Sequence, residues 1–427
     1  MTNTPPRLDR RSFLRITGAG SAAVVLSSGS PSAWAAGTRS KSLRTYAVVV
    51  DGCKPEEITP ELTPRLHQLR AAGTSYPQAR SLPVMETIPN HVMMMSGVRP
   101  DRSGVPANSV YDRTAGVVRD LDRATDLRFA TLLDRLREGG KVTGSVLSKK
   151  YLHGIFGERA SVRWEPQPVV PGSGHAPDAA TADALKSMVD SADPDLVFVN
   201  FGDVDRMGHA DASGTTLEAA RKTALASADS QIGSFVDHLV ATGRWASTIM
   251  LVLADHSMDW STPERVISLQ RAMDADPLLA GRTRTAQHGG ADLLYYTGPT
   301  AERDAAVERM RSAAASVEGV LSVHAPAELR LGGEAGDLVA YCRAGWRFTD
   351  PSVTSNPIPG NHGHPATEPI PFFTTGGHPA IRSGITSAAP ARTVDVAPTL
   401  GSLFHLADPD GGYDGTPRTE GIDTSKL

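Results

Sequence analysis

Four short runs of apolar, mostly β-branched residues set the strongest limit on how this chain can fold: 46–50, 142–147, 196–201 and 249–253. Near-continuous apolar runs of this length are typical of strands that are buried on both faces of a parallel or mixed sheet. Segments with a helical pattern separate the runs: 59–72, 127–138, 179–189 and 215–241. This alternation predicts an α/β fold, a wound sandwich with a mostly parallel central sheet and helices on both faces.

The remainder of the chain is less regular. Residues 257–350 combine weaker strand patterns with one helical segment, 301–317, and we expect an insertion or a cap lobe there. Residues 351–379 are rich in Pro, Gly and His, which predicts a loop, and 394–406 is predicted to form a closing helix. No internal repeat or long linker interrupts the chain, so we expect 37–427 to form one domain with the smaller lobe inserted in it.

The first 36 residues have the layout of an export signal. Arg10 and Arg11 lie in a basic segment, an apolar stretch covers 16–26, and 33–36 reads Ala-Trp-Ala-Ala. These three parts make a secretory signal, and the paired arginines resemble the bacterial twin-arginine type; a disordered basic N-terminus is the alternative. We therefore expect residues 1–36 to direct export to the periplasm, the cell wall or the medium. No later stretch reaches the roughly 18 apolar residues that a membrane span needs.

Charge and cysteine content exclude several classes of protein. The chain has 43 Lys and Arg against 47 Asp and Glu, a formal net charge of −4, which argues against nucleic-acid binding driven by bulk charge. Cys53 and Cys342 are too few for a disulfide scaffold or a cysteine-based zinc module, and whether they pair is left open. The 13 histidines, several beside Asp or Gly, are the first indication of a metal site.

Aspartates follow three of the four strand candidates. Asp51 follows the first run, Asp203 and Asp205 follow the third, and Asp255 follows the fourth. In open α/β sheets the ligand site lies beyond the carboxyl ends of the strands, so these carboxylates are expected at one edge. Carboxylates gathered in this way repel one another unless a cation lies between them.

Histidines accompany two of these aspartates. His256 is adjacent to Asp255, and His209 lies four residues after Asp205, which suits one helical turn better than the spacing from Asp203 does. Carboxylate oxygens together with imidazole nitrogens are typical of zinc or a similar divalent ion. The ordinary alternative for each aspartate taken singly is a helix cap or a turn residue.

Thr87 is the candidate nucleophile. It lies where a loop is predicted to become a helix, and Pro89 suits the first turn of that helix. The N–H groups at a helix N-terminus attract an anion, and a metal lowers the pKa of a hydroxyl that is otherwise a poor nucleophile. A simple helix N-cap is the alternative role for this threonine.

Several motifs occur in a characteristic order: Thr87-Ile-Pro-Asn-His, the segment from Pro100 to Asp112, Asp205-Arg-Met-Gly-His209, Asp255-His256, Gly-Asn-His362-Gly and Thr393-Val-Asp-Val-Ala-Pro-Thr-Leu. Together they resemble the type I phosphodiesterase/nucleotide pyrophosphatases of the alkaline phosphatase superfamily, over residues 44–406. The resemblance implies an alkaline phosphatase-like three-layer α/β/α sandwich. It also implies hydrolysis of phosphodiester or phosphoanhydride bonds in a small phosphate ester or nucleotide.

The same resemblance implies two divalent metal ions, zinc in the family. One ion would be held by Asp205, His209 and His362, and the other by Asp51, Asp255, His256 and the Thr87 oxygen. Thr87 would attack phosphorus to form a phospho-threonine. The Asn108 amide, helped by the Ile88 backbone N–H, would donate to a nonbridging phosphate oxygen, and we also expect Asn90 in the substrate-binding group.

Alternatives remain for several of these residues. His364 competes with His362 as the ligand and is otherwise expected near the mouth of the pocket. Residues 141–157 resemble the lysine-bearing loop of phosphonoacetate hydrolases, so Lys149 or Lys150 could bind an anionic arm of the substrate; the alternative is a solvated pair. Four more histidines are candidate pocket neighbours: His91, His153, His288 and His378.

Three other functions are alternatives to the diesterase. A phosphonate C–P hydrolase and a phosphomonoesterase share the fold and the metal set that the resemblance implies. A secreted, metal-stabilised binding protein without turnover would lack a ligand or the nucleophile, and this sequence has all of them.

Overall fold

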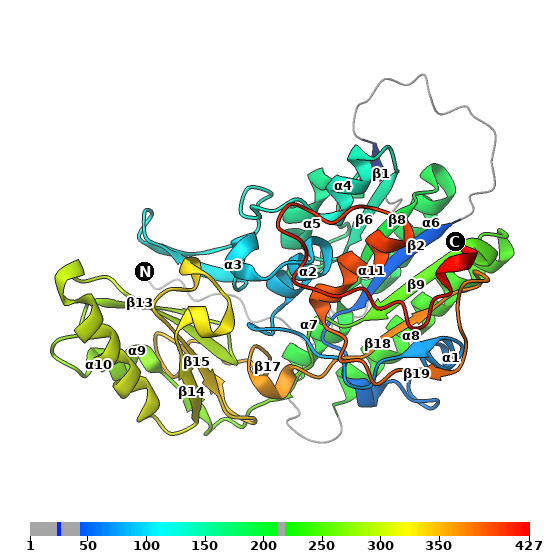
Figure 1. Ribbon diagram of the computed structural model, residues 1–427. Coiled ribbons are helices and arrows are strands. Elements are labelled where there is room, and N and C mark those ends of the chain that lie inside the picture. The colour runs from blue at the N-terminus through cyan, green and yellow to red at the C-terminus, as the bar shows by residue number, and fades with distance from the viewer. Residues whose placement is uncertain (1–23, 27–42, 172, 212–217) are drawn as a thin grey trace, which may run out of the picture.

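A nine-stranded sheet forms the centre of the protein (Figure 1). The structure, a computed structural model, describes residues 24–26, 43–171, 173–211 and 218–427. In spatial order the strands are β1 (Val24–Leu26), β7 (Val162–Trp164), β6 (Thr143–Leu147), β8 (Leu196–Phe201), β2 (Arg44–Val50), β9 (Thr248–Leu253), β18 (Phe372–Thr375), β3 (Thr74–Ser75) and β19 (Ile385–Thr386).

The middle of this sheet is parallel. β7, β6, β8, β2 and β9 all run in the same direction, whereas β1 and β18 run against their neighbours. Every residue of β6, β8, β2 and β9 is buried, as expected for apolar strands covered on both faces. Because the strands are parallel, the carboxyl ends of β2, β8 and β9 meet at one edge.

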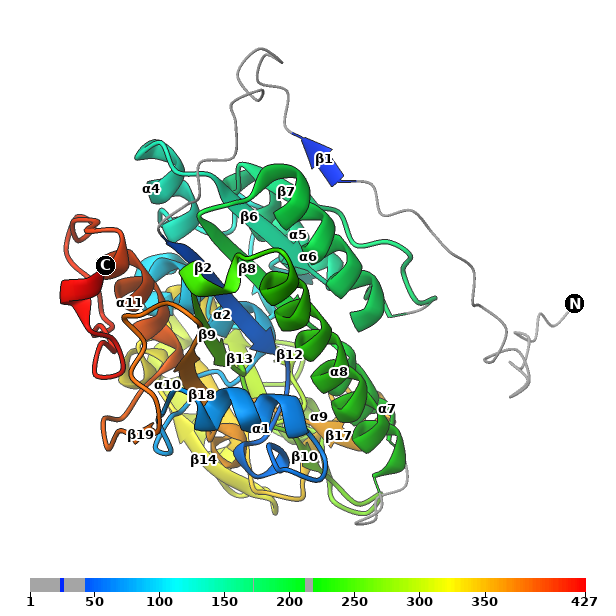
Figure 2. The ribbon, with the colours of Figure 1, turned by 90° about the vertical axis from the view of Figure 1, so that its right-hand side faces the viewer.

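Helices cover both faces of the sheet, which confirms the predicted three-layer α/β/α sandwich (Figure 2). One face carries α1 (Pro64–Ala71), α6 (Asp178–Ala192) and α8 (Ala219–Ala241), and the other carries α2 (Thr87–Ser96), α4 (Leu132–Glu138) and α11 (Val396–Leu403). α4 begins later than the predicted 127–138 because Thr131 and Asp134 form a capping box at its start.

A smaller lobe lies beside the main sheet, within the stretch 257–350 (Figure 1). Its antiparallel sheet has the order β12 (Thr283–Gln287), β13 (Ala291–Tyr296), β15 (Leu338–Cys342) and β14 (Val320–His324). Two helices pack on this sheet, α9 (Leu269–Asp274) and α10 (Arg303–Ala315). Leu269, Met310 and Cys342 belong to an apolar core separate from that of the main sheet.

The prediction of a loop over 351–379 is wrong for two short segments. β17 (Gly360–Asn361) pairs with β10 (Asp259–Trp260), and β18 enters the main sheet between β9 and β3. The run Phe-Phe-Thr-Thr of β18 consists of strand-forming residues, which the Pro, Gly and His content of the whole stretch obscures.

The remaining elements connect these layers: α3 (Pro100–Ser103), the hairpin of β4 (Ser109–Asp112) and β5 (Val117–Asp120), α5 (Lys150–Phe156), α7 (Asp203–Ala210), β11 (Val266–Ile267) and β16 (Arg347–Phe348). Cys53 and Cys342 are both buried as free thiols. Of the predicted export segment, the structure describes only Val24–Leu26, which forms the edge strand β1. Among the described helices, none has the length and apolar character to cross a membrane.

Candidate active site

Three aspartates meet at the carboxyl edge of the parallel strands. Asp51 directly follows β2, Asp205 lies in the first turn of α7 after β8, and Asp255 comes two residues after β9. Asp51 and Asp255 are fully buried and Asp205 is 2% exposed. One oxygen of each, Oδ1 of Asp51, Oδ1 of Asp205 and Oδ2 of Asp255, has no hydrogen-bond partner among the described residues. Buried carboxylate oxygens without donors are costly unless a cation faces them.

Asp203, the alternative to Asp205, has a different role. Its Oδ1 pairs with the Arg206 guanidinium at 2.8 Å, and its Oδ2 accepts the Asp178 N–H at the start of α6. The structure therefore places Asp205, and not Asp203, among the histidines.

Three histidines face these carboxylates through Nε2. His209 Nε2 lies 3.3 Å and His362 Nε2 3.8 Å from Asp205 Oδ1, and His256 Nε2 lies 3.3 Å from Asp255 Oδ2. The Nδ1 atoms of His209, His256 and His362 lie 2.7, 2.9 and 3.1 Å from the backbone oxygens of Gly360, Ser257 and Met85. A carbonyl at Nδ1 assigns the proton to that nitrogen and leaves the Nε2 lone pair free, which is the usual arrangement of metal-ligating histidines.

The donor set fits two divalent cations. Two groups of buried side chains have ligand atoms within 4.8 Å of one another: Asp205 with His256 and His362, and Asp51 with His91 and Asp255. Oxygen and imidazole donors with unpaired carboxylate oxygens between them suit zinc or a similar ion.

His91 was not expected as a ligand, and both of its ring nitrogens are occupied. Nδ1 lies 2.8 Å from the Thr87 carbonyl oxygen, and Nε2 lies 3.0 Å from Asn200 Nδ2, which also donates to Asp51 Oδ2. Burial lowers the pKa of His91 to about 4, so the ring is neutral; it bonds the Thr87 backbone directly and Asp51 through Asn200. Neither His91 in this role nor Asn200 was identified from the sequence.

Thr87 is the first residue of α2, a helix that is buried along its whole length. Its Oγ1 lies 3.2 Å from His256 Nε2 and 3.3 Å from Lys149 Nζ. The helix is therefore fixed in the core while its first hydroxyl faces the carboxylate edge.

Lys149 lies between the carboxylates. Its Nζ is 2.8 Å from both Asp51 Oδ2 and Asp205 Oδ2, and the side chain is completely buried. The alternative of a solvated lysine pair is therefore wrong for Lys149, whereas Lys150 is exposed. Burial acts to raise the pKa of Asp205, but Lys149 and the histidines hold it well below its usual value. Burial and the neighbouring Asp255 raise the pKa of Asp51 to about 6.

Two expected substrate-binding side chains have structural roles. Asn90 is fully buried: its Nδ2 donates to the carbonyls of Leu82, Val84 and Glu86, and its Oδ1 accepts the Leu82 N–H. These bonds hold the loop before α2, and Oδ1 also accepts the Thr393 hydroxyl at 2.8 Å, so no hydrogen-bonding group of Asn90 is left for a substrate. His364 is also fully buried and pairs with Asp259 at 3.0 Å, so it does not lie at the mouth of the pocket.

Asn108 and Ile88 lie together at the site but bond to each other. The Ile88 N–H donates to Asn108 Oδ1 at 2.8 Å. This differs from the expected arrangement, in which both groups donate to a phosphate oxygen. Because the Ile88 N–H is used by Asn108, only Asn108 Nδ2 remains as a donor for phosphate. The Asn108 backbone N–H in turn donates to Glu86 Oε2 at 2.7 Å.

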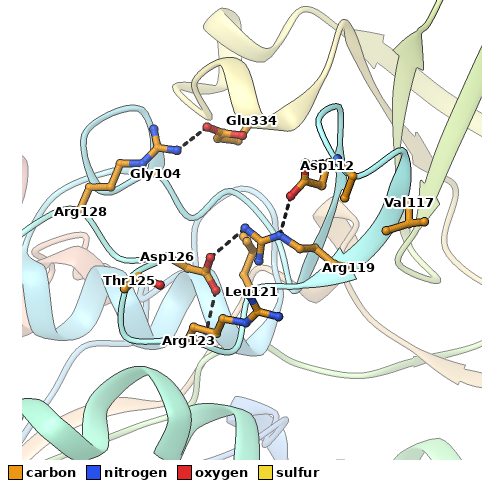
Figure 3. Close-up of a pocket in the computed structure, with 11 residues that line it drawn as sticks. Gly104, Asp112, Val117, Arg119, Leu121, Arg123, Thr125, Asp126, Arg128 and Glu334 are labelled. Atoms are coloured by element: carbon orange, nitrogen blue, oxygen red, sulfur yellow. Dashed lines mark hydrogen bonds and ion pairs between the residues drawn. The ribbon is translucent and has the colours of Figure 1, made fainter.

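A cavity of about 420 Å³ opens beside the metal-ligand side chains and is lined in part by His209, His362 and Asn108. A second cavity, of about 500 Å³, lies at the β4–β5 hairpin (Figure 3). There Arg119 is paired with Asp112 and Asp126, and Arg128 with Glu334. The three carboxylates that line the second cavity are therefore all paired with arginines. No predicted catalytic or metal-binding residue lines this cavity.

A family model for type I phosphodiesterase/nucleotide pyrophosphatase matches residues 45–365. The chain belongs to this family. It is therefore a hydrolase of the phosphodiesterase/nucleotide pyrophosphatase kind with the fold of the alkaline phosphatase superfamily, as the motif order predicted. The family is metal-dependent, in agreement with the two buried ligand groups.

Known relatives cover most of the chain. Human ectonucleotide pyrophosphatase/phosphodiesterase family member 5 is 21% identical over 381 residues, covering 85% of this chain and 74% of that protein. The structure of the murine protein, an inactive variant in complex with AMP, matches with a TM-score of 0.73 at 17% identity and covers 89% of this chain and 100% of that one. Phosphonoacetate hydrolase from Sinorhizobium meliloti 1021, in complex with phosphonoformate, matches with a TM-score of 0.63 at 18% identity, covering 83% and 94%.

One pair that lines the cavity of about 420 Å³ was not predicted. Glu86 Oε1 lies 3.0 Å from His288 Nδ1, and both side chains are almost fully buried. His288 was among the candidate pocket neighbours, but Glu86 was overlooked although it directly precedes Thr87. Its position beside the candidate nucleophile Thr87 was the available indication.

Proposed function

We propose that this chain is an exported, two-zinc phosphodiesterase that cleaves phosphodiester or phosphoanhydride bonds through a phospho-threonine at Thr87. The observation that carries the proposal is the position of Thr87 Oγ1, 3.2 Å from His256 Nε2 at an edge where three buried carboxylates each have an unpaired oxygen. A nucleophile held against a metal-ligand cluster is what in-line attack on phosphorus requires.

The metal ligands would be Asp205, His209 and His362 in one site and Asp51, Asp255, His256 and Thr87 in the other. Zinc bound there would supply positive charge to the phosphoryl oxygens and lower the pKa of the Thr87 hydroxyl.

The chain's own groups do the positioning. α2 fixes Thr87 for attack on phosphorus, so that an Oγ–P bond forms while the bond to the leaving alcohol breaks. Lys149 Nζ, 3.3 Å from Oγ1, stabilises negative charge on the threonine oxygen, and Asn108 Nδ2 donates to a phosphoryl oxygen. A neutral amide suits the single charge of a diester better than the dianion of a monoester, which favours a cationic clamp.

A phosphonate hydrolase is the second candidate, because Lys149 reaches the nucleophile and a phosphonoacetate hydrolase shares the fold. The test compares rates of the zinc-loaded protein on bis(4-nitrophenyl) phosphate, 4-nitrophenyl phosphate, phosphonoacetate and 4-nitrophenyl sulfate. We expect the diester to be fastest. A preference for phosphonoacetate would select the second candidate, and a preference for the monoester or the sulfate would refute both.

Export is tested separately, because most of residues 1–36 lies outside the described part of the chain. Replacing both Arg10 and Arg11 with Lys should retain the precursor in the cytoplasm, as measured by cell fractionation and the mass of the N-terminus. Unchanged export of the double variant would refute a twin-arginine signal. The relative's name, an ectonucleotide pyrophosphatase, supports an extracytoplasmic site of action.

A further inference from the structure

The Glu86–His288 pair forms part of the cavity wall beside the proposed catalytic centre. Glu86 precedes α2, and His288 follows β12 of the smaller lobe, so the two parts of the molecule meet here. Glu86 uses both oxygens: Oε1 lies 3.0 Å from His288 Nδ1, and Oε2 accepts the Asn108 N–H at 2.7 Å. The His288 and Glu86 side chains are only 2% and 3% exposed, so the imidazole has a fixed orientation.

The other ring nitrogen of His288 has no partner. Nε2 is a buried atom without a hydrogen bond among the described residues, on a side chain that lines the cavity. An ionised carboxylate only accepts hydrogen bonds, so in the neutral ring the proton lies on Nδ1, which faces Glu86 Oε1 at 3.0 Å, and Nε2 then carries a lone pair that accepts hydrogen bonds. Buried polar atoms in folded proteins almost always have partners, so this acceptor is suited to a donor group on a bound molecule.

The surrounding wall indicates what kind of molecule that is. Beyond the histidines and Glu86, most side chains of the described lining are polar, with Pro357 and Ile358 as the apolar ones; the polar ones are Asn108, Ser109, Asp120, Gln287, Ser355, Asn356 and Asn361. Hydroxyl, amide and carboxylate groups of this kind match the alternating donors and acceptors of a polyhydroxylated compound.

Other substrate classes fit this lining less well. No Lys or Arg is among the described lining residues, so a polyphosphate chain would find no cationic clamp. No Phe, Tyr or Trp is among the described lining residues either, so the wall offers neither the large rings on which nucleobases usually stack nor an aromatic cage for a quaternary ammonium group.

We infer that this wall is a hydroxyl-binding subsite, in which His288 Nε2 accepts a hydrogen bond from the polyhydroxylated alcohol of a phosphodiester, such as a glycerol or sugar unit. Glu86 is the positioning residue, because it holds the ring and the Asn108 backbone while directly preceding the nucleophile. The inference rests on the proposed diesterase function and narrows its substrate to polyol diesters.

The test measures kcat and KM on two diesters, glycerophosphoglycerol and bis(4-nitrophenyl) phosphate, with the zinc-loaded full-length protein. His288→Asn keeps a donor near the Nδ1 position and removes the acceptor at Nε2. We expect its KM for glycerophosphoglycerol to rise about 5- to 10-fold, and to exceed any rise for the aryl diester by at least about 5-fold. His288→Gln restores an acceptor near Nε2 and should recover most of the loss.

Two further variants separate positioning from folding. Glu86→Gln presents an amide N–H to Nδ1, which should shift His288 toward the tautomer protonated at Nε2 in ¹⁵N NMR and raise the glycerol-diester KM preferentially. His324→Asn is the matched control: this lobe histidine bonds Glu328 and Ser322 and does not line the cavity. It should leave both KM values unchanged.

The outcomes distinguish this inference from the function on which it rests. A wild-type protein that cleaves the aryl diester but not glycerophosphoglycerol overturns the subsite and leaves the diesterase intact. Equal rises of KM on both substrates, or no rise in His288→Asn, also overturn the subsite. Failure to cleave any diester refutes the proposed function itself.

Discussion

Two groups of buried carboxylates, one in each lobe, differ in what faces them. At the edge of the main sheet, Lys149 lies 2.8 Å from both Asp51 and Asp205, and histidines lie close by. In the smaller lobe, Asp292 is fully buried against Asp350, and neither of its oxygens has a hydrogen-bond donor among the described residues. Asp350 itself is satisfied by Ser268 and by backbone N–H groups.

Asp292 of the smaller lobe and Asp205 of the main-sheet group therefore titrate differently. Burial and the neighbouring Asp350 raise the pKa of Asp292 well above its usual value, so this carboxyl binds a proton. Asp205 is as deeply buried, yet Lys149 and the histidines keep its pKa well below the usual value. Burial beside a second carboxyl thus favours the neutral form, whereas Asp205 is kept ionised by the cationic and imidazole groups arranged around it.

The largest expected effect is at the nucleophile of the first group. Thr87→Ala should lower kcat by a factor on the order of 10³ or more, because no other hydroxyl contacts His256 in the described cluster. The measurements are diester turnover and zinc content by elemental analysis, and the two metals should remain bound. Full activity in this variant would rule out the covalent mechanism.

Removing a carboxylate ligand should affect metal and rate together. Asp205→Asn is expected to lose zinc and to lower activity by about 100-fold or more, because two histidines face this one carboxylate. Asp203→Asn is the control, since Asp203 bonds Arg206 and the α6 backbone instead. Zinc loss in the control, with none in Asp205→Asn, would reverse the assignment.

Metal removal should reveal how Lys149 contributes to the main-sheet group. Lys149→Met leaves Asp51 and Asp205 without their buried cation, so the metal-free protein should lose about 3–5 kcal/mol in free energy of unfolding. With zinc restored the loss should be smaller, because the metals take over the neutralising charge. Urea unfolding with and without a chelator measures both values. An equal loss in the two states would show that Lys149 acts through packing alone.

The smallest effect is expected in the smaller lobe and depends on pH. When folding raises the pKa of a carboxyl, the folded protein loses stability as the pH rises from the unfolded pKa of that group, near 4, through its folded pKa. Asp292→Asn donates to Asp350 without ionising, so it should stabilise the protein by about 1–3 kcal/mol at neutral pH and by little below pH 4. Unfolding at both pH values tests this, with diester turnover as the control. Destabilisation at neutral pH would mean that Asp292 is ionised and paired.

Much of the architecture was predictable because it depends on local pattern. Apolar runs identified β2, β6, β8 and β9, and the aspartates after three of them, β2, β8 and β9, identified the carboxylate edge. β18 was missed because its four residues lie in a stretch whose composition indicates a loop.

The roles of single polar side chains were harder to predict. Asn90 and His364 have the residue types of a binding site, but hydrogen bonds to the loop before α2 and to Thr393 occupy Asn90, and Asp259 occupies His364. Lys149 has the residue type of the surface, but it is buried between two carboxylates that are distant in sequence.

The sequence by itself determined the α/β class, the order of the motifs and the family, because buried strands and candidate ligands can be recognised from the types of residues close together in the chain. Only the tertiary structure decided which polar groups face one another. It brought Lys149 to Asp51 and Asp205, and His288 of the smaller lobe to Glu86 beside the nucleophile. Ionisation and hydrogen bonding depend on distances of a few ångströms between segments far apart in the chain, and those distances are set by the packing of the whole fold.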